Sequence, residues 1–331
     1  MFGVSVVEIL FVCSSGRDTR FPQRDYHVCR ELIKLGCKVM VVNAYNPVAG
    51  ALGVLRHRRA KCKVFSGFRA GVTALLLKPL IRKYFYDLVE WKADLCRDNW
   101  KGFKRVLVPL IEFAEIMIMR CAEVVFNAGR EFVHPHVRGF AGKVVFAENG
   151  YNDALFDPEK YDRHSVRRKY GVDFPLVVYI GKLTHMYVKY LLPVIGAMKA
   201  VRERFPRAEF WIVGDGPAKS ILEGYAGEGV RLIGYVPYER VPEVVAMADV
   251  GVNAYSTESL KLREWVAMGL PVIAPPEVRF PGVMNCKWTR EEIAHSIMKL
   301  IEEGARVKVR LNTWRDTARI IMSTCERTCG N

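Results

Sequence analysis

Short apolar runs rich in β-branched and aromatic residues alternate with amphipathic stretches along most of the chain. In the first half, residues 7–13 and the run CKVMVVNA predict strands on either side of a helix at 25–35, which Gly36 ends. A basic stretch that we expect to be mobile follows. After it come a strand at YDLVEW, a helix through VLVPLIEFAEIMIMRCA, and strands at EVVFNA and KVVFAENG. Strands that alternate with helices are typical of a parallel sheet wound on both faces.

The same alternation starts afresh at Pro175. Helical patterns at 190–205, 241–248 and 259–268, and a shorter one, separate the strand-like runs LVVYIGKL, AEFWIVGDGP, VRLIGYV, DVGVNAY and PVIAPP. Two such units predict two doubly wound α/β domains with a hinge within 149–170. Residues 313–327 are helical in pattern, with no strand after them.

Composition excludes several classes of protein. Half of the 331 residues are hydrophobic, which is enough to offset the entropy cost of folding and excludes a disordered chain. The nine cysteines are odd in number and scattered, unlike a secreted disulfide framework, so we expect a reducing, cytoplasmic setting. The apolar N-terminus lacks a basic start and carries Glu8, as expected for a first strand and not for a signal peptide. No uncharged apolar run approaches the roughly 20 residues that span a bilayer.

Charge is concentrated in one segment. The chain carries a net charge of +15, and residues 56–105 hold 14 basic and 4 acidic side chains. Basic residues interleaved with Leu, Ile, Phe and Tyr favour binding to an anionic membrane surface. A solvated basic face is an equally simple interpretation. Nucleic acid is a third, but no motif for specific RNA or DNA recognition accompanies the charge.

Several strands end in glycine, serine or threonine, where a doubly wound sheet binds ligands through free N–H groups and helix dipoles. These candidate positions are Gly181-Lys182, Gly214-Asp215-Gly216, Gly234 and Ser256-Thr257. None forms a dinucleotide fingerprint or a phosphate loop of the GxxxxGK[ST] type. Taken singly, each glycine is equally explained as a plain turn.

The segment STESLKLREWVAMGLPVIAPP is more specific. On a helix that begins near Ser256, Lys261 and Glu264 are i, i+3 neighbours and share a face. Such a pair can hold a nucleotide diphosphate sugar, with the lysine on phosphate and the glutamate on ribose hydroxyls. An ordinary surface Lys–Glu pair is the alternative.

The second half of the chain resembles the nucleotide-sugar-binding domain of family 4 glycosyltransferases. The resemblance lies in four segments in this order: GKL, FWIVGDGP, RLIGYVP and ADVGVNAYSTESLKLREWVAMGLPVIA. VVFAENGYNDALFDPEK resembles that family's interdomain segment, and CSSGRDTRFPQRDYHVCRELIKLGCKVMVV resembles its first β-α-β unit. The resemblance implies a GT-B fold, that is, two Rossmann-like domains facing across a cleft. The implied divisions are an acceptor-side domain at 1–155, a donor domain at 156–312, and a helix at 313–331 that crosses back to the first domain.

The resemblance also assigns roles within the donor domain. Lys182 and Lys189 correspond to residues that contact the donor diphosphate, and Lys261 lies in the phosphate region of a subgroup. Glu264 corresponds to the ribose-binding second glutamate of an E-x7-E motif, whereas Glu258 stands six positions before it instead of eight. The resemblance further implies that Gly234, Tyr235 and Val236 flank the base and that Gly16 approaches the phosphates. The strand-end positions Gly181, Gly214, Gly216, Ser256 and Thr257 complete the predicted donor contacts.

In this family the reaction retains anomeric configuration, and lysines and N–H groups neutralise the leaving diphosphate, so no metal or other cofactor is implied. On the acceptor side the candidates are Asp94, Asp98 and His134. For the two aspartates, capping of the following helix is an equal alternative; His134 is otherwise a structural or surface histidine.

We therefore predict a glycosyltransferase that moves a sugar from a UDP- or GDP-sugar to a lipid-linked or polysaccharide acceptor. We also predict that the enzyme is cytoplasmic and that residues 56–105 bind it to the inner face of the membrane. No specific nucleic-acid partner is expected. The competing class is a non-catalytic nucleotide-sugar-binding or interaction protein of the same fold.

Overall fold

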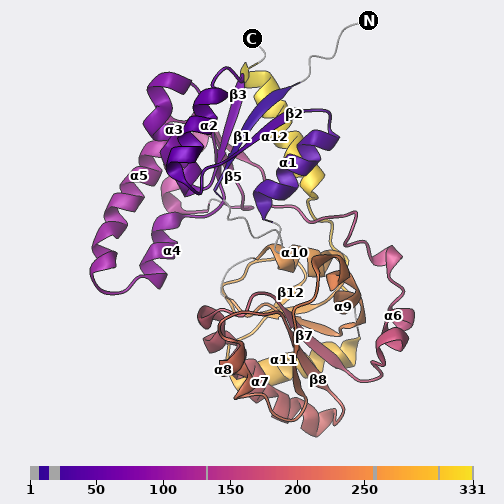
Figure 1. The fold of residues 1–331 in the computed structure, drawn as a ribbon. Helices are drawn as coiled ribbons and strands as arrows, with labels where there is room; N and C mark the ends of the chain where they lie inside the picture. The colour runs from indigo at the N-terminus through magenta and orange to yellow at the C-terminus, as the bar shows by residue number, and fades with distance from the viewer. Residues whose placement is uncertain (1–6, 15–22, 132, 256–258, 305, 330–331) are drawn as a thin grey trace, which may run out of the picture. The chain divides into compact units, whose positions relative to one another are not determined.

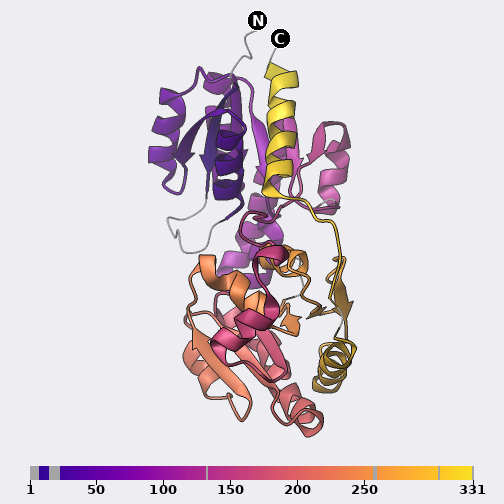
Figure 2. The ribbon, with the colours of Figure 1, turned by 90° about the vertical axis from the view of Figure 1, so that its right-hand side faces the viewer.

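The computed structural model describes residues 7–14, 23–131, 133–255, 259–304 and 306–329. The chain divides into two compact units: unit 1 comprises residues 1–150 and 312–331, and unit 2 comprises residues 151–311. Each unit contains one six-stranded parallel sheet with helices on both faces (Figures 1 and 2), which confirms the predicted fold class. Within the described ranges, no helix combines the length and the apolar content needed to cross a bilayer.

Unit 1 orders its strands β2-β1-β3-β4-β5-β6. The strands are β1 (Glu8–Cys13), β2 (Lys38–Asn43), β3 (Cys62–Ser66), β4 (Phe85–Leu88), β5 (Val124–Asn127) and β6 (Val144–Phe146). The helices are α1 (Arg24–Lys34), α2 (Pro47–Arg56), α3 (Phe68–Ile81), α4 (Lys92–Asn99), α5 (Val108–Cys121) and α12 (Trp314–Cys329), with the 3-10 helices η1 (Gly102–Leu107) and η2 (Pro135–Lys143).

The alternation of side chains along β1 explains why both faces of this sheet are covered. Leu10 and Val12 enter a core formed with α2, α3, α4 and α5. Ile9 and Phe11 are just as completely buried on the opposite face, where α1 and α12 pack side by side (Figure 1). Complete burial of such side chains contributes about 1.5–3 kcal/mol each relative to exposure.

The basic stretch that was expected to be mobile is regular secondary structure, so that expectation is wrong. Residues 47–81 form α2, β3 and α3, and β3 pairs with β1 on one side and β4 on the other. The four cations of residues 56–61 are exposed, whereas Lys63 inside β3 is buried. The basic charge therefore surrounds a central strand of the core.

The last helix belongs to unit 1. Trp314 stacks on His27 of α1 with ring centroids 5.0 Å apart, and the Thr317 hydroxyl donates a hydrogen bond to the Glu148 carbonyl. A Cβ on Gly150 would lie 2.2 Å from the Trp314 nitrogen, so the two segments can meet only at a glycine. A disulfide joins Cys62 of β3 to Cys325 of α12, a pairing that the cysteine spacing did not indicate.

Unit 2 orders its strands β12-β11-β10-β7-β8-β9. The strands are β7 (Leu176–Ile180), β8 (Glu209–Val213), β9 (Val230–Gly234), β10 (Val250–Val252), β11 (Val272–Ala274) and β12 (Val283–Asn285). The helices are α6 (Arg163–Tyr170), α7 (His185–Arg204), α8 (Lys219–Glu223), α9 (Val241–Met247), α10 (Leu260–Ala267) and α11 (Arg290–Glu303), with the 3-10 helices η3 (Pro158–Lys160) and η4 (Tyr238–Arg240).

The sheet of unit 2 also separates two cores. Leu176, Val178 and Ile180 of β7 face α6, α9 and α10. Val177 and Tyr179 face α7, α8 and α11. Because β7 is buried on both sides, its sequence is a continuous apolar run, as expected for a central parallel strand.

Candidate functional site

The strand order of unit 2 reverses between β7 and β10, which are neighbours in the sheet. In parallel sheets the loops that follow two such strands diverge, and a ligand can bind at the carboxyl edge between them. Gly181 and Lys182 follow β7, and the segment after β10 leads to α10, with Lys261 in its first turn. Two lysines predicted from separate motifs thus belong to the same edge of one sheet.

The glycines after β7 and β8 allow two loops to touch through their backbones. A Cβ on Gly214 would lie 1.9 Å from the Gly181 oxygen, and a Cβ on Gly216 would lie 2.3 Å from the Leu183 oxygen. The Leu183 N–H donates to the Asp215 carbonyl at 2.9 Å. Any larger residue at positions 214 and 216 would therefore push the loops apart at the predicted site.

Lys261 occupies a cage of aromatic rings. Its Nζ lies 4.0 Å from the ring centroid of Tyr179, 5.4 Å from that of Trp265 and 5.5 Å from that of Tyr187. Burial lowers the pKa of Lys261 to about 7, while the ring faces favour the ammonium form. Among the described residues, no carboxylate forms an ion pair with it, so its charge is available to an anion that approaches past Gly181.

Glu264 is buried one turn further along α10. Its Oε1 accepts a hydrogen bond from the Tyr238 hydroxyl, which favours the carboxylate, but burial dominates and raises the pKa of Glu264 to about 8. No ion pair joins Lys261 to Glu264, and Glu264 is buried, so the alternative of an exposed surface pair is wrong.

The start of α7 adds groups suited to an anion. Lys182 and Lys189 are exposed, with Lys182 just before the helix and Lys189 within it. Thr184, the N-cap residue, has a buried hydroxyl with no hydrogen-bond partner among the described residues. The first N–H groups of a helix lack carbonyl partners one turn earlier. In α7 the Tyr187 N–H donates to the Thr184 carbonyl at 3.0 Å, which leaves the two N–H groups before it to donate to phosphate oxygens. Sequence reasoning missed Thr184, although a threonine before a helical run is an N-cap signal.

Other predicted contacts lie at the end of β9. Gly234 closes that strand, and a Cβ there would meet no atom within 4 Å, while Tyr235 is exposed and Val236 partly buried. Four predicted donor residues, Gly16, Ser256, Thr257 and Glu258, lie outside the described residues.

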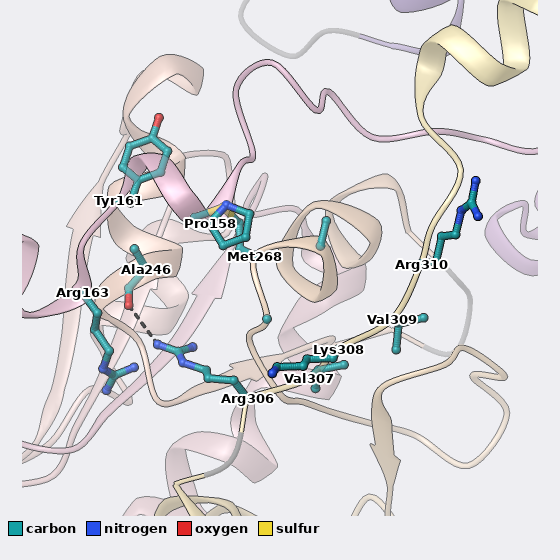
Figure 3. Close-up of a pocket in the computed structure, with 12 residues that line it drawn as sticks. Pro158, Tyr161, Arg163, Ala246, Met268, Arg306, Val307, Lys308, Val309 and Arg310 are labelled. Atoms are coloured by element: carbon teal, nitrogen blue, oxygen red, sulfur yellow. Dashed lines mark hydrogen bonds between the residues drawn. The ribbon is translucent and has the colours of Figure 1, made fainter.

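A groove of about 620 Å³ occurs elsewhere on unit 2. Its lining includes Ala246, before β10, and Ala267 to Gly269, before β11, so it lies toward the amino ends of these strands. Figure 3 shows the Arg306 side chain donating to the Ala246 carbonyl, at 3.0 Å. Burial, with Arg163 nearby, lowers the pKa of Arg306 to about 10. None of the predicted donor residues lines this groove.

In unit 1, Asp94 and His134 lie together, while Asp98 is exposed on the same helix. Both aspartates are inside α4, and the two oxygens of Glu115 accept the Lys92 and Ala93 N–H groups at its start, at 2.7 and 2.9 Å. In the helical segment that follows, Lys101 precedes η1 and Leu107 precedes α5. The alternative that Asp94 or Asp98 caps the following helix is therefore wrong.

A buried pair that the sequence did not reveal lies at the carboxyl edge of the unit 1 sheet. The Arg24 guanidinium donates to both oxygens of Asp87, with Nη2 2.8 Å from Oδ1, and both residues are almost fully buried. Arg24 also donates to Asn149 Oδ1 and the Ala147 carbonyl, and Ser66 donates to Asp87. The pair thereby joins the start of α1 to the ends of β3, β4 and β6.

Residues 174–303 match the family described as glycosyl transferases group 1. The match covers most of unit 2, including the loops after β7, β8 and β9 and all of α10. No curated protein matches the sequence.

Solved structures match nearly the whole chain at low sequence identity. HepE from Anabaena, in complex with UDP, is 15% identical with a TM-score of 0.67, covering 97% of this chain and 95% of HepE. Sucrose-phosphate synthase from Thermosynechococcus elongatus is 13% identical with a TM-score of 0.67, covering 98% and 95%. WaaG, a glycosyltransferase involved in lipopolysaccharide biosynthesis, is 12% identical with a TM-score of 0.66, covering 98% and 100%.

These similarities establish the GT-B fold, and residues 174–303 of unit 2 resemble the glycosyl transferases group 1 family. The chain is accordingly an enzyme of the glycosyltransferase class.

Proposed function

We propose that the enzyme transfers a sugar with retention of configuration from a UDP- or GDP-sugar bound at the carboxyl edge of the unit 2 sheet. The observation that carries the proposal is Lys261, an ammonium group in an aromatic cage with no acidic partner in the described ranges. A nucleoside diphosphate supplies the missing negative charge. HepE binds UDP and UDP-glucose in its crystal structures, which makes UDP-sugars the first donors to test.

The residues of this edge have different roles in the proposed transfer. Lys261 and Lys182, with the start of α7 and Lys189, stabilise the charge that develops on the leaving diphosphate, the task that a metal ion performs in other transferases. Glu264 accepts hydrogen bonds from the ribose hydroxyls. In this scheme the departing phosphate takes the proton of the acceptor hydroxyl, and the reaction needs neither a metal nor another cofactor.

A panel of UDP-, GDP- and ADP-sugars tests the donor. A true donor raises the melting temperature, because it binds only the folded protein. Wild-type protein should then release the nucleoside diphosphate from that donor, and the double variant Lys182→Ala with Glu264→Ala should not. If no donor shifts the melting temperature, the proposed donor site is refuted. A shift without turnover, in wild type and variant alike, would favour a binding protein of the same fold.

A membrane surface on unit 1 would suit a lipid-linked acceptor. The α4–α5 hairpin, joined through η1 (Figure 1), carries exposed apolar side chains next to exposed cations. Phe103 is 81% exposed. The hairpin surface consists of Lys101, Phe103, Lys104, Arg105, Val106, Leu107, Leu110 and Phe113. Apolar side chains flanked by cations match an anionic leaflet such as the inner face of a membrane.

Flotation with vesicles tests this surface. Wild-type protein should float with anionic vesicles at low salt, and less with neutral ones, because each lysine or arginine near the headgroups contributes about 1 kcal/mol. Phe103→Ser with Phe113→Ser should reduce binding at least tenfold, whereas Tyr225→Ser, which changes an exposed aromatic residue of unit 2, should not. Failure of the wild type to float at low salt would contradict the membrane proposal and leave the donor site untouched.

A further inference from the structure

Two histidines and two carboxylates from three segments of unit 1 lie close together. One ligand atom each of Glu112, His134 and His136 lies within 4.8 Å of the other two. Glu112 belongs to α5, while His134 and His136 flank Pro135 at the start of η2. Asp94 of α4 adjoins them, with Oδ2 3.4 Å from Nε2 of His134.

The contacts of the carboxylates leave one oxygen of each directed at a histidine. Asp94 uses Oδ1 and Glu112 uses Oε2 to pair with the Arg97 guanidinium, the latter at 3.3 Å. The other oxygens face the rings, Oδ2 of Asp94 toward His134 and Oε1 of Glu112 toward His136, the latter at 3.4 Å from Nε2. Arg97 thus orients both carboxylates from outside the cluster, as outer-shell partners of metal ligands do.

Stacking orders the two imidazoles. The His134 ring stacks on Trp91 with centroids 4.3 Å apart, and the His136 ring stacks on His134 at 4.9 Å. Nδ1 of His134 accepts a hydrogen bond from the backbone N–H of His136 at 3.2 Å, so the ring proton of His134 is on Nε2, beside Asp94. A cation bound at Nε2 would move that proton to Nδ1, at the expense of this one hydrogen bond.

We propose that Asp94, Glu112, His134 and His136 form a Zn²⁺ site that joins α4 and α5 to the start of η2. Imidazole nitrogens and carboxylate oxygens are ligands that Zn²⁺ accepts in tetrahedral sites. His136 is exposed and His134 is partly so, which gives the ion access from solvent. The ion would brace the same hairpin that presents Phe103 and Leu110. Its role would be structural, within unit 1.

Metal analysis of untagged, full-length protein tests the site. After equilibration with Zn²⁺ and removal of unbound metal, we expect one zinc ion per chain in the wild type. His134→Ala with His136→Ala should remove it, and His164→Ala, which changes an exposed histidine of unit 2, should retain it. Because free cysteines also bind zinc, equal zinc in the wild type and the double variant would overturn the proposal, as would absence of zinc from the wild type.

Two further measurements separate metal binding from loss of fold. Co²⁺ in place of Zn²⁺ should produce the visible absorption of a tetrahedral nitrogen–oxygen site in the wild type only. Zn²⁺ should raise the melting temperature of the wild type and leave that of a folded His134→Ala, His136→Ala variant unchanged. UDP binding should be the same with and without zinc, so failure of this site and failure of the donor site are distinguishable.

Discussion

Replacing Lys261 by Met should lower kcat/KM for sugar transfer by about 10² to 10³-fold and weaken the binding of UDP. Methionine keeps an apolar side chain among Tyr179, Tyr187 and Trp265, so the aromatic cage stays filled while the charge is lost. Removal of a single preorganised group that stabilises developing charge typically costs about 2.7–4 kcal/mol in the transition state. Calorimetry with UDP, and turnover with the donor found in the panel, measure the two effects.

The control is Lys199→Met, an exposed lysine of α7 outside the helix start. It should leave both UDP affinity and turnover unchanged, because it removes the same net charge at a distance from the proposed diphosphate. Wild-type affinity and turnover in a folded Lys261→Met protein would show that the diphosphate binds elsewhere.

Affinity for UDP should also depend on pH. Burial lowers the pKa of Lys261 to about 7 in the free protein, and the diphosphate binds the protonated form. The Kd for UDP should therefore rise above pH 7, by roughly tenfold per pH unit until the pKa of the bound state is reached, and vary little with this group below pH 7. Glu264, with a pKa raised to about 8, loses its proton in the same range. In Lys261→Met, only the part of the pH dependence of the Kd that is due to Lys261 should disappear.

The carboxyl edge of the unit 2 sheet shows which parts of the proposed donor site can be predicted from a sequence. Lys182 follows an apolar strand and Lys261 opens an amphipathic helix, so local pattern is enough to predict both. The cage around Lys261 is not local, because Tyr179 and Tyr187 come from β7 and α7, more than seventy residues earlier. A strand order has to be known before these rings can be placed beside the lysine.

In unit 1 the missed elements have identifiable causes. The helix α2 carries standard signals, since Asn46 caps it through the Val48 and Ala49 N–H groups and Pro47 is its first residue, but the basic charge that follows obscured them. The strand β3 is short and follows four cations, so its burial depends on pairing with β1 and β4. The disulfide spans 263 residues, a separation at which sequence spacing carries no information.

Breaking the buried pair of Arg24 and Asp87 should have the largest effect on stability. Asp87→Asn keeps the shape of the side chain but leaves the Arg24 guanidinium without its charged partner in a nearly solvent-free position. Loss of one member of such a pair typically costs about 3–5 kcal/mol, a large share of the roughly 5–15 kcal/mol that stabilises a domain. The expected result is a decrease of that size in the free energy of opening of amides in β3 and β4, measured by hydrogen exchange.

Exchange of individual amides is preferable to a whole-chain melting curve, because two units need not unfold as one. The matched control is Glu302→Gln, which breaks the exposed pair of Arg204 and Glu302, 3.2 Å apart, and should cost no more than about 1 kcal/mol. A double variant, Arg24→Met with Asp87→Asn, should lose less than the sum of the two single changes, because neither partner is then left charged and buried. Equal, small losses for the buried and the exposed pair would mean that water reaches Asp87 and that the carboxyl edge of unit 1 does not depend on this contact.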